Sequence, residues 1–174
     1  MTLPTAISPR PRVDLPHHRI HEGRYFAVTT TATGLPAGVP KDYMIISPPA
    51  FISIAHVIII VTVFPGATFQ IFESAIVSAN GIPLSSFNQD RANPTAATGF
   101  AFEDPTVVST GTLLFSQIIG SSTAGGTGGT KYRDEEEFLF KPLTNYLVRT
   151  VPLASGTILS IQMRAYRQAT ARGT

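Results

Sequence analysis

The 174-residue chain carries a formal net charge of +2, is 43% hydrophobic and contains only 14% charged residues. Soluble domains usually have roughly a quarter of their residues charged, so this composition predicts a surface that partner subunits partly cover. The chain has no cysteine, which excludes disulfides and thiolate metal sites. A net charge of +2 is too small to indicate a nucleic-acid partner, and the length predicts one main domain.

Residues 1–22 are expected to form an extended N-terminal arm. Four prolines fall within the first sixteen residues, and each one fixes φ and removes a backbone donor, which disfavours helix and central strand. Arginine is favoured at protein interfaces because its planar fork pairs with carboxylates. We therefore expect Arg10, Arg12 and Arg19 to contact an acidic partner surface.

The arm also holds the one histidine cluster of the sequence, which could suggest a metal site. Neutral imidazoles bind zinc when they converge on one ion. In an extended chain, His17 and His21 would lie more than about 10 Å apart. We therefore expect no metal here, and we expect these side chains to make polar contacts where the arm meets the domain.

From residue 24 onward, β-type runs alternate with turn signals. The run at 50–64 is too short to span a bilayer, is rich in β-branched residues and predicts a buried strand, so we expect no membrane interaction. His56 within it is expected to be a hydrogen-bonded core residue, and 83–105 looks irregular. The expected strands, in chain order, are 24–32, 43–47, 51–64, 68–78, 106–119, 135–142, 145–151 and 157–167.

The last expected strand shows the clearest alternation of the chain. One set of alternate positions is apolar and the other mainly polar, which predicts a sheet with one buried face and one face toward water or a partner. The two sets are Leu159, Ile161, Met163 and Ala165 against Ile158, Ser160, Gln162 and Arg164. Eight or so such strands predict an all-β fold, an antiparallel β-sandwich that is jelly-roll-like. It would span residues 23–167, with a C-terminal tail at 168–174.

The glycine-rich stretch at 120–131 lacks the residue order of a phosphate-binding loop. A P-loop needs glycine directly before its lysine and a hydroxyl directly after it. Thr130 precedes Lys131 and Tyr132 follows it. The stretch is therefore interpreted as a flexible surface loop.

Glu135 and Glu137 occupy alternate positions of an expected strand, on the same side and about 7 Å apart. Glycosidase carboxylates must instead face each other across the scissile bond. We expect these two acids to form a solvated strand entry, or to pair with an arginine of a neighbouring subunit.

The segment after the Asn80-Gly81 turn is rich in amide and guanidinium groups. Asn88, Gln89, Asp90 and Arg91 would suit hydrogen bonds to backbone groups of an adjoining chain. No order or spacing of serine, histidine and acid supports a catalytic triad. The sequence thus predicts no catalytic residue and no cofactor.

Three stretches together resemble a known family. They are "IHEG" at 20–23, "NGIPLSSFNQDRANP" at 80–94 and "FLFKPLTNYLVRTV" at 138–151. In this order they are similar to motifs of the capsid decoration (cement) proteins of tailed bacteriophages, namely an iHeG start, an N-x-N-R loop and an L-K-P-x-x-x-Y-x-x-R strand pair. Asp90 stands where that family usually has asparagine.

The resemblance implies a non-enzymatic virion protein that binds the outer surface of a phage head and stabilises the capsid by bridging capsomers. Its partners would be the major capsid protein and sister subunits in a homo-oligomer, commonly a trimer, with no nucleic acid and no membrane. It would be made in the host cytoplasm and reside on the capsid surface, and it would need no metal or cofactor. Two alternatives stay open: another virion β-sandwich, such as a tail, fibre or glycan-binding receptor module, and a β-sandwich hydrolase.

Overall fold

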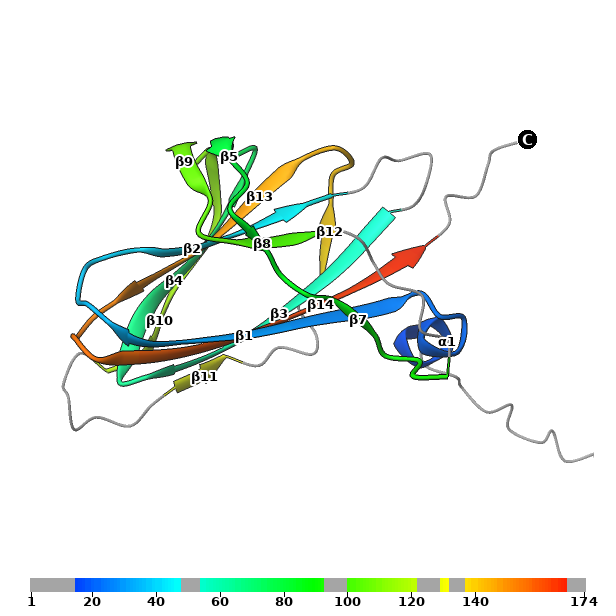
Figure 1. Ribbon diagram of the computed structural model, residues 1–174, viewed down its shortest axis with the longest axis horizontal. Helices are drawn as coiled ribbons and strands as arrows, with labels where there is room; N and C mark the ends of the chain where they lie inside the picture. The colour runs from blue at the N-terminus through cyan, green and yellow to red at the C-terminus, as the bar shows by residue number, and fades with distance from the viewer. Residues whose placement is uncertain (1–14, 48–53, 93–99, 122–128, 132–136, 169–174) are drawn as a thin grey trace, which may run out of the picture.

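The structure of the protein, a computed structural model, describes residues 15–47, 54–92, 100–121, 129–131 and 137–168 (Figure 1). Its elements are α1 (Leu15–His21), β1 (Tyr25–Leu35), β2 (Lys41–Ile46), β3 (Ile54–Phe64), β4 (Gly66–Glu73), β5 (Ile76–Ala79), β6 (Ile82–Pro83), β7 (Phe87–Asn88), β8 (Ala101–Glu103), β9 (Thr106–Ser109), β10 (Thr112–Gly120), β11 (Gly129–Lys131), β12 (Phe138–Phe140), β13 (Asn145–Pro152) and β14 (Thr157–Gln168).

Two antiparallel sheets pack face to face. The first has the order β11-β3-β14-β1-β7, with β12 also pairing β3, and the second has the order β10-β4-β13-β2-β8-β6. Four neighbouring strands of each sheet, β1-β14-β3-β11 and β2-β13-β4-β10, give the strand order of a jelly roll, in which the chain passes back and forth between the sheets. The predicted antiparallel, jelly-roll-like β-sandwich is confirmed.

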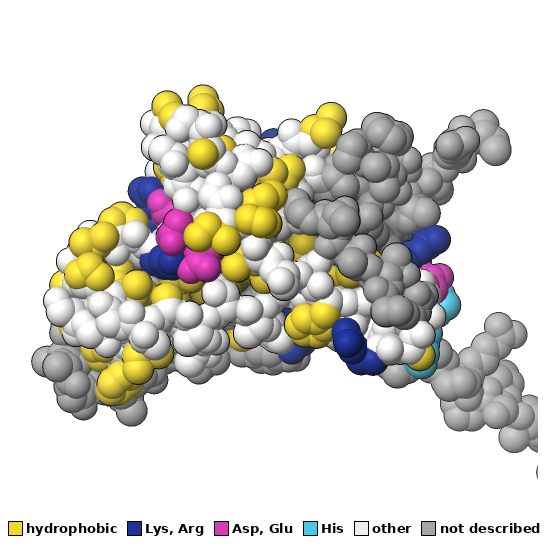
Figure 2. Space-filling view, in the orientation of Figure 1, with side chains coloured by type: hydrophobic (Ala, Val, Ile, Leu, Met, Phe, Trp, Pro, Cys, Tyr) yellow, Lys and Arg dark blue, Asp and Glu magenta, His cyan; other side chains and the backbone are white. Residues whose placement is uncertain are grey.

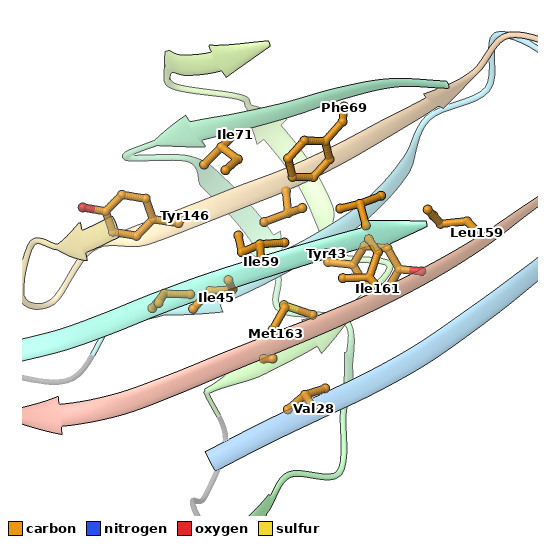
Figure 3. Close-up of a cluster of buried hydrophobic side chains, with 14 of the residues drawn as sticks. Val28, Tyr43, Ile45, Ile59, Phe69, Ile71, Tyr146, Leu159, Ile161 and Met163 are labelled. Carbon is orange, nitrogen blue, oxygen red and sulfur yellow. The ribbon is translucent and has the colours of Figure 1, made fainter. Parts of the chain in front are cut away.

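The core fills the space between the two sheets with alternate side chains of each strand (Figure 3). Leu159, Ile161 and Met163 of β14 are fully buried, as their alternation predicted. They meet Tyr43 and Tyr146 from the opposite sheet, which are buried to the same degree. Each such side chain contributes about 1.5–3 kcal/mol through its removal from water, so the sandwich is held mainly by these two inner faces.

The expectation of an extended arm up to residue 22 is wrong for its last part, because Leu15–His21 form the helix α1. Pro16 falls in the first turn of this helix, where a missing N–H costs no hydrogen bond. The helix contacts β1 and β14 and therefore belongs to the folded domain. Residues 1–14 and the predicted tail at 169–174 lie outside the described residues.

The region that looked irregular, 83–105, contains β7, β8 and the end of β6; β7 pairs with β1, whereas β6 and β8 complete a long two-stranded ribbon. β4 pairs β10 at one edge of the second sheet, β5 pairs β9 beyond it, and β6 pairs β8 at the opposite edge. The β5–β9 pair, which we call the arch, rises above the sheet in Figure 1. It rests on a small apolar cluster in which Val107 of β9 packs against Phe72 and Leu147 of the sheet.

Each foot of the arch turns through residues with positive φ. Ser74 (φ 62°) and Gly111 (φ 81°) form one foot, and Gly81 (φ 89°) and Asp104 (φ 53°) form the other. These values lie in the left-handed region, which glycine enters without steric cost. At Gly111 a Cβ would also lie only 2.2 Å from the carbonyl oxygen of Glu73, so the two strands can cross there only because the side chain is absent.

We predict that Gly111→Ala destabilises the fold much more than Gly38→Ala. Both glycines have positive φ, but a Cβ at Gly38 would meet nothing within 4 Å. Gly38→Ala should therefore cost only the conformational penalty of about 1–2 kcal/mol, whereas Gly111→Ala also forces the backbone apart. The free energy of unfolding, measured by urea denaturation, checks this. Equal losses in the two variants would show that the close approach at the foot is unimportant.

Candidate functional site

Three segments that are far apart in sequence meet at one end of the sandwich. Figure 1 shows α1 at this end, beside β7 and the start of β1. β14 ends here too, because Tyr166 near its end pairs with Tyr25 at the start of β1. We call this region the α1 end, and its described residues are His18–Tyr25, Phe87–Arg91, His56, Glu137 and Arg164–Tyr166.

The loop after β7 is fastened to the turn between α1 and β1. The Asn88 Nδ2 donates to the Gly23 carbonyl oxygen at 2.9 Å, and the Asn88 Oδ1 accepts from the backbone N–H of Asp90 at 2.9 Å. The backbone N–H of Gln89 donates to the Tyr25 carbonyl oxygen, also at 2.9 Å. These bonds join "IHEG" to the "NQDR" loop, so two of the three stretches that carry the family resemblance form one structural unit.

The prediction that residues 88–91 all face a partner needs correction at Asn88. Its side chain is only 2% exposed and satisfies backbone groups of its own chain. Gln89 and Asp90 are half-buried, and the Asp90 carboxylate accepts from the N–H of Ala92. Arg91 is exposed, and its predicted contact with a partner stays a prediction.

A row of rings crosses the outer face of the first sheet at this end. Tyr25, Tyr166 and His56 are direct neighbours on β1, β14 and β3. The two tyrosine rings stack at 5.7 Å, and the His56 ring stacks on Tyr166 at 4.5 Å. Glu137 contacts His56 Nδ1, and burial together with a hydrogen bond to Glu137 raises the pKa of Tyr166. The row covers the end of the first sheet, and the contact of Glu137 with His56 links the start of β12 to it.

The row of rings bears on the sequence predictions for His56 and Glu137. His56 is hydrogen-bonded, as predicted, but it lies on the outer face of its sheet and not between the sheets, because Val57 takes the inner position. Glu137 is exposed at the entry to β12, as predicted, and it also contacts His56 of its own chain. Its pairing with an arginine of a neighbouring subunit stays a prediction. Arg10, Arg12 and Glu135 lie outside the described residues.

Positive charge at the α1 end is only partly neutralised. Arg19 contacts Glu22 and lowers the pKa of that carboxyl group. Arg24, by contrast, reaches Glu22 only at 4.0 Å and is half-exposed. For Arg91 and Arg164 the described part of the chain provides no carboxylate within salt-bridge distance. The Arg164 Nε donates to the side-chain oxygen of Gln162 on the same strand.

Three further cations whose side chains the structure describes, Lys41, Lys141 and Arg149, are paired with carboxylates. Lys41 lies 2.5 Å from Glu103 and 2.8 Å from Asp104, and its side chain is 15% exposed. Figure 2 shows side chains of opposite charge side by side over β2 and β8. The remaining pairs are Lys141 with Glu73 at 2.7 Å and Arg149 with Asp42 at 2.7 Å. Uncommitted positive charge among the described side chains is therefore gathered at the α1 end.

The row of stacked rings could not be predicted from the sequence, because it depends on the register between strands that are distant in sequence.

Within the described ranges, no three histidine or acidic side chains are placed to hold a metal ion. No helix there is long and apolar enough to cross a membrane. Comparison of the chain with protein-family models, curated proteins and solved structures gave no significant match.

We predict that Asn88→Ala loosens the α1 end, whereas Gln89→Ala does not. Removing the Asn88 amide leaves the buried Gly23 carbonyl without its donor, which costs about 1–3 kcal/mol. Gln89 serves this junction through its backbone N–H, which alanine retains. Limited proteolysis of the α1–β1 turn, together with thermal unfolding, checks the difference. Similar protection of the turn in both variants would contradict this role for Asn88.

Proposed function

We propose that this protein is a non-enzymatic structural component of a tailed-phage virion that attaches to the outer surface of the head through its α1 end. The observation that carries the proposal is the uneven use of charge: Lys41, Lys141 and Arg149 are held by carboxylates, while Arg24 and Arg91 remain available at one end. A rigid body with exposed guanidinium groups at one end suits an acidic, carboxylate-rich surface.

The third stretch of the family resemblance supports a structural role in a different way. The Tyr146 hydroxyl accepts from the backbone N–H of Lys141 at 2.8 Å and donates to Glu73 at 3.0 Å, and its ring stacks on Phe140 at 3.6 Å. Burial, together with the Glu73 carboxylate, raises the pKa of Tyr146 to about 12. The tyrosine therefore stays neutral and fixes the turn between β12 and β13, a task that requires no chemistry on a substrate.

Attachment of this kind would stabilise a shell by mass action. A protein that binds assembled capsomers, but not free subunits, shifts the equilibrium toward the assembled shell. Contact with the major capsid protein through the α1 end would leave the arch and the opposite end free to meet sister subunits. A trimer, the arrangement that the family resemblance implies, would let each chain add its contact area to the same junction.

Binding to purified heads that lack the protein tests this proposal. We predict that Arg24→Gln combined with Arg91→Gln weakens binding at least about tenfold, which is about 1.4 kcal/mol. Higher salt should weaken the intact protein more than this variant, because salt screens exposed charges. Sedimentation of heads with labelled protein measures both effects, and melting temperatures confirm that each variant folds.

The matched control is Thr33→Glu combined with Val39→Glu, which changes the net charge by the same −2. Both positions are exposed and belong to the end of β1 and the following turn, at the opposite end of the sandwich. The control should bind as tightly as the intact chain. Equal weakening of both variants would mean that only net charge matters, and failure of the intact protein to bind heads would refute the proposal. Binding of the intact protein to host glycans in place of heads would favour the receptor-module alternative.

A further inference from the structure

Asn80 and Gly81 link β5 to β6 at one foot of the arch. Both residues are exposed, and they lie between the β5–β9 pair and the β6–β8 pair of the ribbon. The Asn80 side chain has no hydrogen-bond partner within the described chain. Its amide group is therefore open to water and can rotate toward the backbone that follows it.

The fold requires glycine at position 81. Gly81 has a φ of 89°, in the left-handed region. A Cβ on this residue would also lie 2.1 Å from the carbonyl oxygen of Glu103 and 2.8 Å from that of Asp104. The residue after Asn80 therefore has no side chain that could shield its backbone nitrogen.

The side chain of an asparagine can react with the backbone of the next residue, which makes asparagine one of the heat-labile residues of proteins. The backbone nitrogen loses its proton and bonds to the side-chain carbon Cγ, and the amide nitrogen takes up a proton and leaves as ammonia. Water then opens the cyclic succinimide at either of its carbonyl carbons, which gives aspartate or isoaspartate. A side chain on the attacking residue hinders ring closure, so glycine at that position favours the reaction.

The other three asparagines of the sequence are less able to react in this way. Asn88 is 2% exposed, and its amide donates to a backbone carbonyl of its own chain. Asn145 lies in β13, and its amide donates to the Ala75 carbonyl oxygen at 3.4 Å. Asn93 precedes Pro94, which has no N–H with which to close the ring.

We propose that Asn80 is a modification site, which loses ammonia in the folded protein and becomes aspartate or isoaspartate by reaction with water. Both products place a carboxylate at the foot of the arch, where β8 already carries Glu103 and Asp104 follows it. Isoaspartate also adds one methylene group to the main chain between β5 and β6. The spacing of the two strand pairs then no longer matches, so this foot of the arch loosens as the protein ages.

Incubation of the purified intact chain at physiological temperature and pH tests the proposal. Peptide mapping by mass spectrometry should find conversion at Asn80 at least about tenfold faster than at Asn88 or Asn145. An isoaspartyl methyltransferase should label the aged intact chain much more than aged Asn80→Gln, because glutamine would have to form a larger ring. Equal rates at the three asparagines, or equal labelling of the intact chain and Asn80→Gln, would refute the proposal.

A comparison with the unfolded chain separates the role of the fold from that of the sequence alone. Because the folded chain leaves Asn80 exposed and next to glycine, its rate of conversion should stay within about tenfold of the rate in urea. Asn88 should gain more from unfolding, because it loses its burial and its hydrogen bond. Protection of Asn80 by the fold as strong as that of Asn88 would show that its amide does not reach Gly81 in the folded protein.

Limited proteolysis measures the effect on the arch. Aged intact protein should be cleaved within the arch several-fold faster than fresh protein, whereas aged Asn80→Gln should resist as well as fresh protein does. Fresh Asn80→Asp carries the new carboxylate without the extra methylene and should also resist. Equal cleavage of aged and fresh intact protein would show that the foot does not loosen, and rapid cleavage of fresh Asn80→Asp would contradict the role of the methylene. These experiments use no phage heads, so their failure is separate from failure of the proposed attachment.

Discussion

The pairing of β14 with both β1 and β3 is the constraint on which the rest of the structure depends. This last strand of the fold lies in the middle of the first sheet, with β1 along one side and β3 along the other. Its inner residues fill the core, and its outer residue Tyr166 anchors the ring row beneath α1. The first sheet is therefore complete only with the last strand of the fold in place, and the α1 end is built on that same strand.

Local patterns in the sequence predicted where the strands lie better than they predicted the contacts between distant residues. Alternation along β14 foretold which side chains are buried, because the period of a strand is a property of the strand itself. The helix α1 was missed, because proline was treated as a barrier throughout the segment, although Pro16 is compatible with a first turn. Asn88 was assigned to a partner for a similar reason: its acceptor, the Gly23 carbonyl, lies 65 residues away in sequence, and no local pattern reveals it.

The low charge of the chain acquires a meaning from the structure. Four of its described basic side chains, at Arg19, Lys41, Lys141 and Arg149, are used in ion pairs within the domain. Such pairs fix turns and strand ends, but they leave little charge for the surface. The long segment that includes β9, β10 and the glycine-rich stretch carries none. Among the described side chains, the exposed positive charge of the α1 end is therefore separate from this uncharged segment.

The arch has a mechanical consequence. The same two-stranded ribbon forms one edge of the second sheet as β4 and β10, and the opposite edge as β6 and β8. A load that pulls at either edge is therefore carried over the sheet by covalent chain and by the backbone hydrogen bonds of β5 and β9. The ribbon links the two edges of the second sheet, so neither edge can separate from the sheet without straining the other. A domain built in this way would resist tearing along its strands as well as across them.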